Sequence, residues 1–144
     1  MALYPDISGQ NVVWDGHDGN DREIFLYDGS TVTQLTDNDY YDNDPRVSGQ
    51  NVVWTGWDGS DWEIFLYDGS TVTQLTDNTS SDRLPKIGNG GHVVWHGSEG
   101  GDWEIYLGLD AATLIDLVSF VAVPHGPAVH VSWETASEIG AEGF

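Results

Sequence analysis

An internal repeat with an offset of 40 residues is the feature that most limits what this chain can fold into. The segment Glu23–Asn38 returns without a change at Glu63–Asn78, and Ser8–Trp14 returns in the same way at Ser48–Trp54. A repeat this close is a structural unit, because each copy folds alike and packs on its neighbours. The sequence therefore predicts a row of similar supersecondary units.

A third, diverged copy follows the two close ones. Prolines at positions 5, 45 and 85 keep the period, whereas Val93–Trp95 and Glu104–Leu107 lie one residue late after an insertion near Gly90. We therefore divide residues 1–117 into three repeats and treat the rest as a separate segment. The predicted borders are 5–44, 45–84, 85–117 and 118–144.

Each repeat has the pattern of four short β-strands. In the first repeat, Asn11–Trp14 and Glu23–Tyr27 are rich in β-branched and aromatic residues, and Thr31–Thr36 alternates β-branched with polar residues. Asp28-Gly29, between the last two of these segments, is a strong hairpin signal. Together with the short extended piece after Pro5, these segments predict a four-stranded antiparallel meander.

The apolar residues of these strands form continuous runs and do not alternate with polar ones. Val12–Trp14 and Ile24–Tyr27 are two such runs, and a continuous run is expected of a strand that is covered on both faces. Four-stranded units with a period near 40 residues, stacked face to face, are typical of β-propeller blades. A two-sheet sandwich would explain the strands but not the period. We predict an all-β fold of propeller blades, with an incomplete ring in one chain.

Four spaced motifs recur in order along the chain, namely Asp44–Ser48, Val52–Trp54, Asp58–Tyr67 and Gln74–Asn78. Together they resemble the repeat of TolB-like β-propellers, over residues 5 to about 107. The resemblance implies radial closure of the blades and a role in binding rather than catalysis. It also implies a bacterial parent protein located outside the cytoplasm, in the periplasm or the extracellular space. It carries no site residue over to this chain.

The composition excludes several classes of partner. Four basic residues against 24 acidic ones give a formal net charge of −20, which makes binding to nucleic acid or to an anionic membrane unfavourable. No apolar run reaches the roughly 18 to 20 residues of a membrane span, and Met1–Pro5 lacks the basic start and apolar centre of a signal peptide. Without cysteine, neither disulfides nor thiolate metal sites are expected.

The segment after the third repeat departs from the pattern. Thr113–Leu117 is expected to be an outer strand of the third repeat, and Val118–Val123 and Ala128–Trp133 flank a Pro124–Pro127 turn as in a β-hairpin. With residues 134–144, this segment resembles the beginning of a fibronectin-III-like module. Its roughly 27 residues are too few for such a sandwich, which needs about 100.

Three blades are fewer than the four to eight of a closed propeller. Each terminal blade would expose an apolar face, and exposing ~400 Å² of apolar surface forgoes on the order of 10 kcal/mol. We therefore predict that the chain associates with copies of itself, and we favour a dimer whose six blades close the ring. The predicted function is a non-catalytic binding or assembly scaffold. A lectin-like glycan-binding propeller and a non-catalytic fragment of a larger secreted hydrolase are the alternatives.

The acidic loops are candidate calcium sites, because they bring hard oxygen ligands close together. Their spacing does not match that of an EF-hand, and Asp and Asn in tight loops also bond to their own backbone and supply turn geometry. Both interpretations stay open, and no other cofactor is predicted. The candidate ligands are Asp15, Asp18, Asn20, Asp21, Asp58 and Asp61.

Aromatic loop residues are the candidate contacts for a glycan or protein ligand, because rings on a rigid scaffold can stack against sugars. These residues are His17, Trp57, Trp62 and Trp103. A second set of aromatic residues occupies equivalent strand positions and is expected in the core between blades: Trp14, Trp54 and Trp95.

The sequence does not predict an enzyme. Its five histidines show no metal-binding spacing, and no serine lies in a nucleophile elbow. Glu23, Glu63 and Glu104 recur at strand starts, and this repetition favours a structural hydrogen bond over an acid and base pair.

Overall fold

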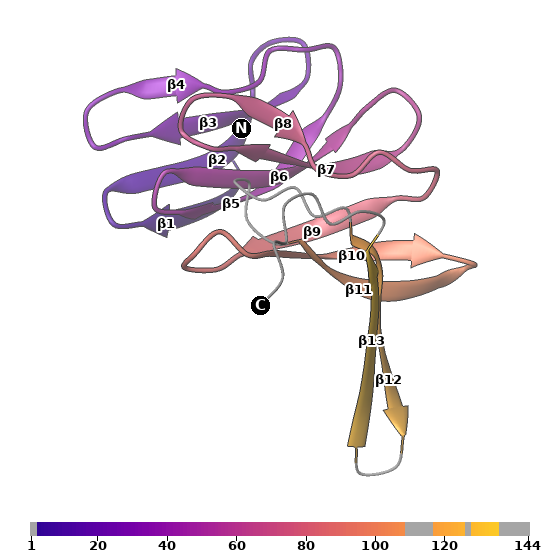
Figure 1. Ribbon diagram of the computed structural model, residues 1–144. Helices are drawn as coiled ribbons and strands as arrows, with labels where there is room; N and C mark the ends of the chain where they lie inside the picture. The colour runs from indigo at the N-terminus through magenta and orange to yellow at the C-terminus, as the bar shows by residue number, and fades with distance from the viewer. Residues whose placement is uncertain (1–2, 109–116, 126–127, 136–144) are drawn as a thin grey trace.

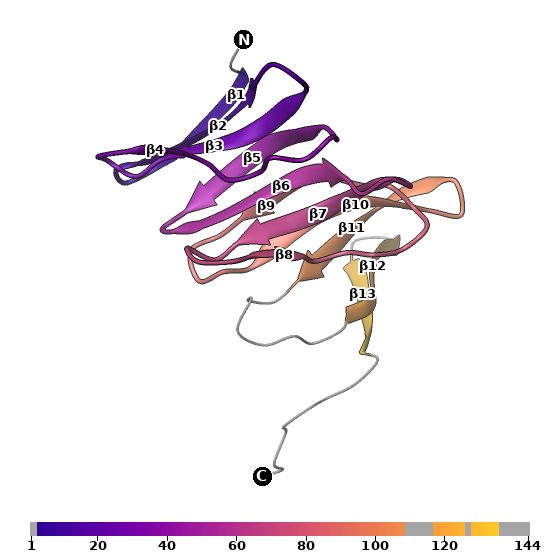
Figure 2. The same ribbon diagram turned by 90° about the horizontal axis from the view of Figure 1, so that it is seen from above.

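The computed structural model describes residues 3–108, 117–125 and 128–135, and all regular elements in these residues are β-strands. Three antiparallel sheets are stacked face to face in a row, and a separate two-stranded hairpin projects from the last sheet (Figures 1 and 2). Among the described residues, no helix is long and apolar enough to cross a membrane.

The strands of each sheet follow one another in chain order, so each sheet is a meander. The first two sheets have four strands each, as predicted, and the third has three in the described part of the chain. The first sheet contains β1 (Leu3–Ser8), β2 (Asn11–His17), β3 (Arg22–Tyr27) and β4 (Val32–Gln34). The second contains β5 (Asp42–Ser48), β6 (Asn51–Trp57), β7 (Trp62–Tyr67) and β8 (Val72–Gln74). The third contains β9 (Asp82–Ile87), β10 (Val93–Glu99) and β11 (Asp102–Gly108).

The hairpin between β3 and β4 forms where Asp28-Gly29 predicted it. Gly29 has a φ of 97°, and Asp28 Oδ1 accepts hydrogen bonds from the backbone amides of Ser30 and Thr31, both at 2.8 Å. The strand β4 ends earlier than predicted. After Gln34 the chain leaves the regular ladder, and the Thr36 hydroxyl accepts a hydrogen bond from the Ile24 amide at 2.9 Å.

A bulge in the first strand of each sheet lies just before the repeated proline. Tyr4, Asp44 and Leu84 have φ values of 49°, 54° and 55°, a left-handed conformation that non-glycine residues adopt only at a cost. The strand register shifts at the same point in each sheet. Because of this bulge, β5 already begins at Asp42, which places an additional acidic residue inside the sheet.

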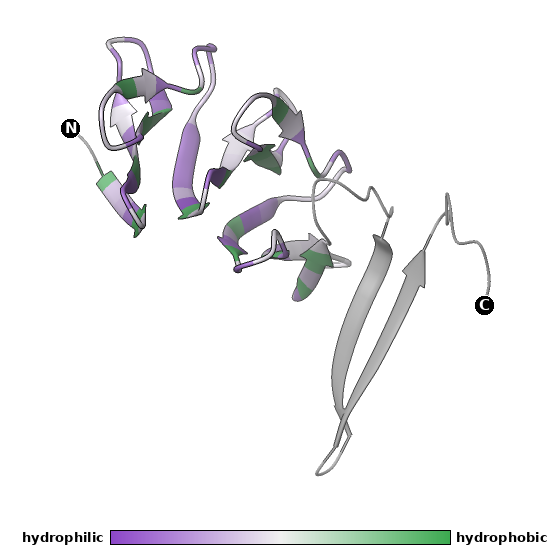
Figure 3. Ribbon diagram, turned by 60° about the vertical axis from the view of Figure 1, so that its left-hand side comes forward, coloured by the Kyte–Doolittle hydropathy of each residue, from purple (hydrophilic) through white to green (hydrophobic). Residues whose placement is uncertain are grey.

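The hydrophobic core lies between the sheets, and the hydrophobic residues are mostly on the strands (Figure 3). Between the first and second sheets, Val13 and Ile24 pack against Trp54. Between the second and third sheets, Val53 packs with Trp95. The prediction that Trp54 and Trp95 lie between blades is confirmed.

The C-terminal hairpin consists of β12 (Leu117–His125) and β13 (Ala128–Thr135), paired antiparallel. The strand β12 contacts β11, and the hairpin then points away from the three sheets (Figure 1). The predicted outer strand at residues 113–117 lies outside the described residues, except for Leu117, which belongs to β12. The fibronectin-III-like resemblance and the domain borders stay predictions.

Candidate functional site

A buried glutamate stands near the start of the third strand in each of the first two sheets. Glu23 in β3 and Glu63 in β7 are both 0% exposed. One oxygen of each accepts a hydrogen bond from a backbone amide that follows the fourth strand, from Asn38 to Glu23 and from Asn78 to Glu63, both at 2.9 Å. The predicted structural role of these two glutamates is confirmed.

An aspartate from the next sheet faces each glutamate. Asp42 accepts a hydrogen bond from the Asn38 side-chain amide at 2.8 Å and a second one from the Trp54 indole at 2.9 Å. Asp82 repeats this pattern with Asn78 at 2.7 Å and Trp95 at 3.1 Å. Each network therefore ties the end of one sheet to the first two strands of the next. We call it the carboxylate junction, and the residues that the structure describes contain two.

A glycine makes room for each of these aspartates. A Cβ atom on Gly56 would lie 2.4 Å from Asp42 Oδ1 and 2.8 Å from the Phe65 ring. A Cβ atom on Gly97 would lie 2.4 Å from Asp82 Oδ1. Neither distance is possible between real atoms, so a side chain at these positions would displace the aspartate.

Burial governs the protonation of the junction. Removal from water raises the pKa of Glu63 to about 7, and the negative charge of Asp82 adds to this effect. Burial also raises the pKa of Asp82. Two carboxyl groups held this close bind a proton that free carboxylates would release at neutral pH. The arrangement is closed by protein on all sides, which suits a structural role.

The junction is incomplete at both ends of the row of sheets. Ala2 stands where the period of 40 residues places Asp42 and Asp82. After Glu104, the positions that correspond to Thr36 and Asn38 are Leu117 and Ser119. The sequence therefore supplies no third or fourth junction of this kind. The spacing from Asp42 to Pro45, repeated from Asp82 to Pro85, was the signal that could have revealed the aspartates.

The structure separates the predicted calcium ligands into different groups. Asp18 lies in a group with Glu23 and Asp37, and Asp58 and Asp61 lie in a second group with Glu63. Asp21 is buried, with 5% of its surface exposed. Sequence reasoning treated Asp37 as part of a separate acidic cluster and Glu23 and Glu63 as structural residues. It did not place them with the loop acids, because they are distant from the loops along the chain.

Asp15 and Asn20, like Asp21, belong to neither group. Asp15 is fully buried in β2 and accepts a hydrogen bond from Arg22 at 2.9 Å, which makes an ion pair. Asn20 is exposed and donates from its side chain to Asp39 at 3.2 Å. In the structure these residues serve the packing and the loop geometry of the first sheet.

The predicted aromatic contacts are distributed over the three sheets. Trp57 and Trp62 are cross-strand partners whose rings meet edge to face at 5.5 Å. The Arg83 guanidinium, from the third sheet, lies 4.8 Å from the centre of the Trp62 ring. His17 is exposed on the first sheet and Trp103 on the third, where it is 58% exposed. The structure thus pairs two of the four residues.

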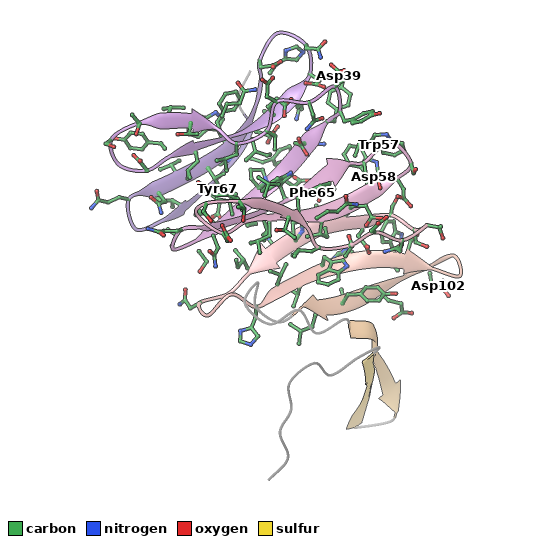
Figure 4. The ribbon with its side chains drawn as sticks, turned by 45° about the horizontal axis from the view of Figure 1, so that its top comes forward. Asp39, Trp57, Asp58, Phe65, Tyr67 and Asp102 are labelled. Carbon is green, nitrogen blue, oxygen red and sulfur yellow. The ribbon has the colours of Figure 1, made fainter. Side chains whose placement is uncertain are left out.

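Acidic and aromatic residues share one rim of the stacked sheets. In Figure 4, Asp39, Asp58 and Asp102 follow one another along this rim, with Trp57 beside Asp58, whereas Tyr67 lies at the opposite end of its strand. The rim is formed by the loops between the second and third strands of the sheets and by the connection from β4 to β5, which contains Asp39. A ligand that approached there would meet a strongly negative surface.

A hollow of about 350 Å³ lies on the third sheet, and sequence reasoning missed it. Its polar lining is basic, with Arg46, Lys86 and His96, and its apolar lining includes Val94 and Ile105. Val94 and Ile105 are 37% and 50% exposed. Arg46 comes from β5 of the second sheet, whereas the other lining residues belong to the third sheet.

Comparison with known proteins yields structural relatives only. No family model matches the chain, and the curated proteins contain no significant match. The β-propeller domain of the Trilobed protease from Pyrococcus furiosus, which has an open velcro topology, has a TM-score of 0.63 at 14% identity and covers 74% of this chain and 36% of that one. A TolB-like protein from Agrobacterium tumefaciens gives 0.58 at 20% identity, over 94% of this chain and 48% of that one. Acylaminoacyl peptidase from Pyrococcus horikoshii gives 0.62 at 14% identity, over 96% and 26%.

The stacked meanders and these similarities define the fold as an incomplete β-propeller. More closely, the fold is TolB-like, which confirms what the repeat motifs implied. The chain spans between 26% and 48% of the length of the three structures. It is therefore similar to part of a propeller.

Proposed function

We propose that this chain is a non-catalytic propeller segment that acts as an assembly scaffold, and that a second copy covers its two open blade faces. The single observation that supports this function is that the outer faces of the first and third sheets carry the same kinds of apolar residue as the faces that are packed between sheets. In the middle sheet, Val52 and Trp54 face the first sheet, and Val53 and Ile64 face the third. All four side chains are 0% exposed.

The outer face of the first sheet carries the same kinds of residue without a cover. Ile7 corresponds to Val47, yet Ile7 is 66% exposed and Val47 only 6%. Pro45 is fully buried, whereas Pro5 at the equivalent position is exposed. Trp14, which corresponds to the buried Trp54, is half-buried. This face is built to be packed against a preceding blade.

The outer face of the third sheet is built to be packed against a following blade. Val94 and Ile105 correspond to Val53 and Ile64, but they are 37% and 50% exposed. A second copy offers the matching surface, because the open face of its first sheet is of the type that packs here within the chain. Two such contacts, related by a twofold axis, would produce a closed ring of six blades.

The mass in solution tests this assembly. We expect light scattering after size exclusion to give twice the chain mass of 15.8 kDa. Ile105→Asp places a charge on the open apolar face and is expected to yield the monomer, because an unpaired charge in an interface is costly. Val32→Asp is the matched control, since Val32 lies in β4 and is 58% exposed outside this face. A wild-type mass of one chain over a wide concentration range would reject the proposal.

The location of the parent protein outside the cytoplasm is part of the same proposal. It is supported by the TolB-like fold of the chain. It agrees with the high acidic charge, which keeps such an assembly soluble. Fractionation of cells that express the native gene, with detection by an antibody, would test it.

A further inference from the structure

The hollow on the third sheet gathers positive charge in a strongly acidic chain. Arg46 and Lys86 line it together with His96, and they are two of only four lysine and arginine residues in a chain with a net charge of −20. Among the described residues, the single ion pair joins Arg22 to Asp15. Neither cation of the hollow therefore has a carboxylate partner within the described part of the chain. Like charges placed together repel each other, so the hollow is suited to receive a negative group.

The hollow includes the outer face of the third sheet. Val94 on β10 pairs with Lys86 on β9, and residues directly opposite each other on neighbouring strands lie on the same face of a sheet. Val53, which corresponds to Val94, packs between the second and third sheets. Lys86 therefore belongs to the face that a second copy covers in the proposed assembly, and the present inference rests on that proposed function.

The contact between the first and second sheets indicates what Lys86 can reach. The first strands β1, β5 and β9 of the three sheets lie side by side, and position 86 in β9 corresponds to position 6 in β1. Asp6 reaches across to the second sheet, where its Oδ2 accepts a hydrogen bond from the backbone amide of Val47 at 3.0 Å. The same geometry at the end of the row would bring Lys86 to β1 of a second copy, next to Asp6 and Ile7.

The change from aspartate to lysine at this position changes which group can be bound. An ammonium group only donates hydrogen bonds, so Lys86 cannot accept one from a backbone amide as Asp6 does. It needs an acceptor, and Asp6 is the acidic residue of β1. Asp6 is only half-buried, and its Oδ1 accepts no hydrogen bond from the described residues. Arg46 adds a second positive charge to the hollow.

We propose that Lys86, assisted by Arg46, forms an ion pair with Asp6 of a second copy, and that this pair selects the contact between the third sheet of one copy and the first sheet of the other. Two molecules that each carry a net charge of −20 repel each other, so a local attraction decides which surfaces can meet. A contact between two third sheets would place Lys86 against Lys86, and a contact between two first sheets would place Asp6 against Asp6. In a ring of two copies the ion pair forms twice.

An exchange of the two charges tests this ion pair. Lys86→Glu places a second carboxylate opposite Asp6, and Asp6→Lys places a second ammonium group opposite Lys86. Each variant alone should dimerise about tenfold more weakly than the wild type, or worse, because the repulsion acts at both contacts. An equimolar mixture of the two variants has opposite charges at both contacts and should dimerise about as well as the wild type. Analytical ultracentrifugation at pH 7.5 and physiological ionic strength measures the dissociation constants.

Two further variants separate the ion pair from general effects. Arg83→Glu makes the same change in net charge as Lys86→Glu, but Arg83 packs on the Trp62 ring of the second sheet, outside the hollow. Its dimer affinity should stay within about threefold of the wild type. Asp6→Asn keeps an oxygen that can accept from the Val47 amide and removes only the charge. It should weaken the dimer less than Asp6→Lys does, and circular dichroism with thermal melting checks that each variant folds.

The outcomes distinguish this inference from the proposed self-association. A wild-type chain that stays a monomer would reject the self-association and the ion pair together. A wild-type dimer that Lys86→Glu and Arg83→Glu weaken equally would overturn the ion pair and leave the self-association standing. The ion pair would also be overturned if the mixture of Lys86→Glu and Asp6→Lys associated no better than either variant alone.

Discussion

Gly56→Ala is expected to lower the free energy of unfolding by about 2 to 4 kcal/mol, an unusually large effect for the addition of one methyl group. The new Cβ would lie 2.4 Å from Asp42 Oδ1 and 2.8 Å from the Phe65 ring. To avoid it, Asp42 has to give up its hydrogen bonds from Asn38 and Trp54, which leaves buried polar atoms unpaired. Urea denaturation followed by tryptophan fluorescence measures the loss.

Gly16→Ala is the matched control for this prediction. Gly16 is the equivalent position in the first sheet, where a Cβ would lie 3.2 Å from the Phe25 ring and would meet no aspartate. At this distance the Phe25 ring has to shift by only a few tenths of an ångström. We expect a change within about 1 kcal/mol, the usual range for a tolerated glycine to alanine substitution. An equal decrease in the free energy of unfolding in Gly56→Ala and Gly16→Ala would show that the carboxylate junction does not add to the stability.

Glu63→Gln is expected to be more stable than the wild-type chain at pH 8, by about 2 to 3 kcal/mol. The pKa of Glu63 is raised by burial to about 7 from an ordinary value of 4.5. The folded chain therefore binds a proton that the unfolded chain releases. Its stabilising contribution is complete below pH 4.5 and is lost as the pH rises through 7. Glutamine stays neutral, so the variant does not lose this contribution.

The comparison of wild type and variant across pH isolates the buried acid from the general repulsion of a highly charged chain. At pH 5 the two should agree within about 1 kcal/mol, because glutamine resembles the protonated glutamate. Glu104→Gln, at the same position of the third sheet, should leave the pH dependence unchanged, since no junction aspartate follows Glu104 in the sequence. A chelator keeps metal out of all samples. Parallel wild-type and Glu63→Gln curves between pH 5 and 8 would refute the prediction.

The period and the apolar runs carried most of the information about the fold. Val52–Trp54 forms a continuous apolar run because both faces of β6 are covered, and this property is visible in the sequence. The start of β5 at Asp42 was not predictable in the same way. In a sequence, a proline at position 45 indicates that a strand cannot begin before it. In the structure, β5 continues through Pro45 because Asp44 adopts a positive φ in a bulge.

The candidate sites were less predictable, because they depend on which acidic residues the fold brings together. The segment Glu23–Asn38 is identical to Glu63–Asn78, yet the acidic group of the first sheet contains Asp37, whereas that of the second sheet contains Asp61 and not Asp77. A difference of this kind comes from the three-dimensional surroundings. The same is true of Asp15, which sequence spacing grouped with the loop acids and which the fold pairs with Arg22.

The absence of an aspartate at position 2 affects which oligomers copies of the chain could form. Contacts between copies would lack the buried acid pair that contacts inside a copy have. A linear fibre gains only one of the weaker contacts per added molecule, whereas a ring of two gains both at once and at high effective concentration. The alanine at position 2, in place of a junction aspartate, would thus favour a closed dimer over a linear polymer.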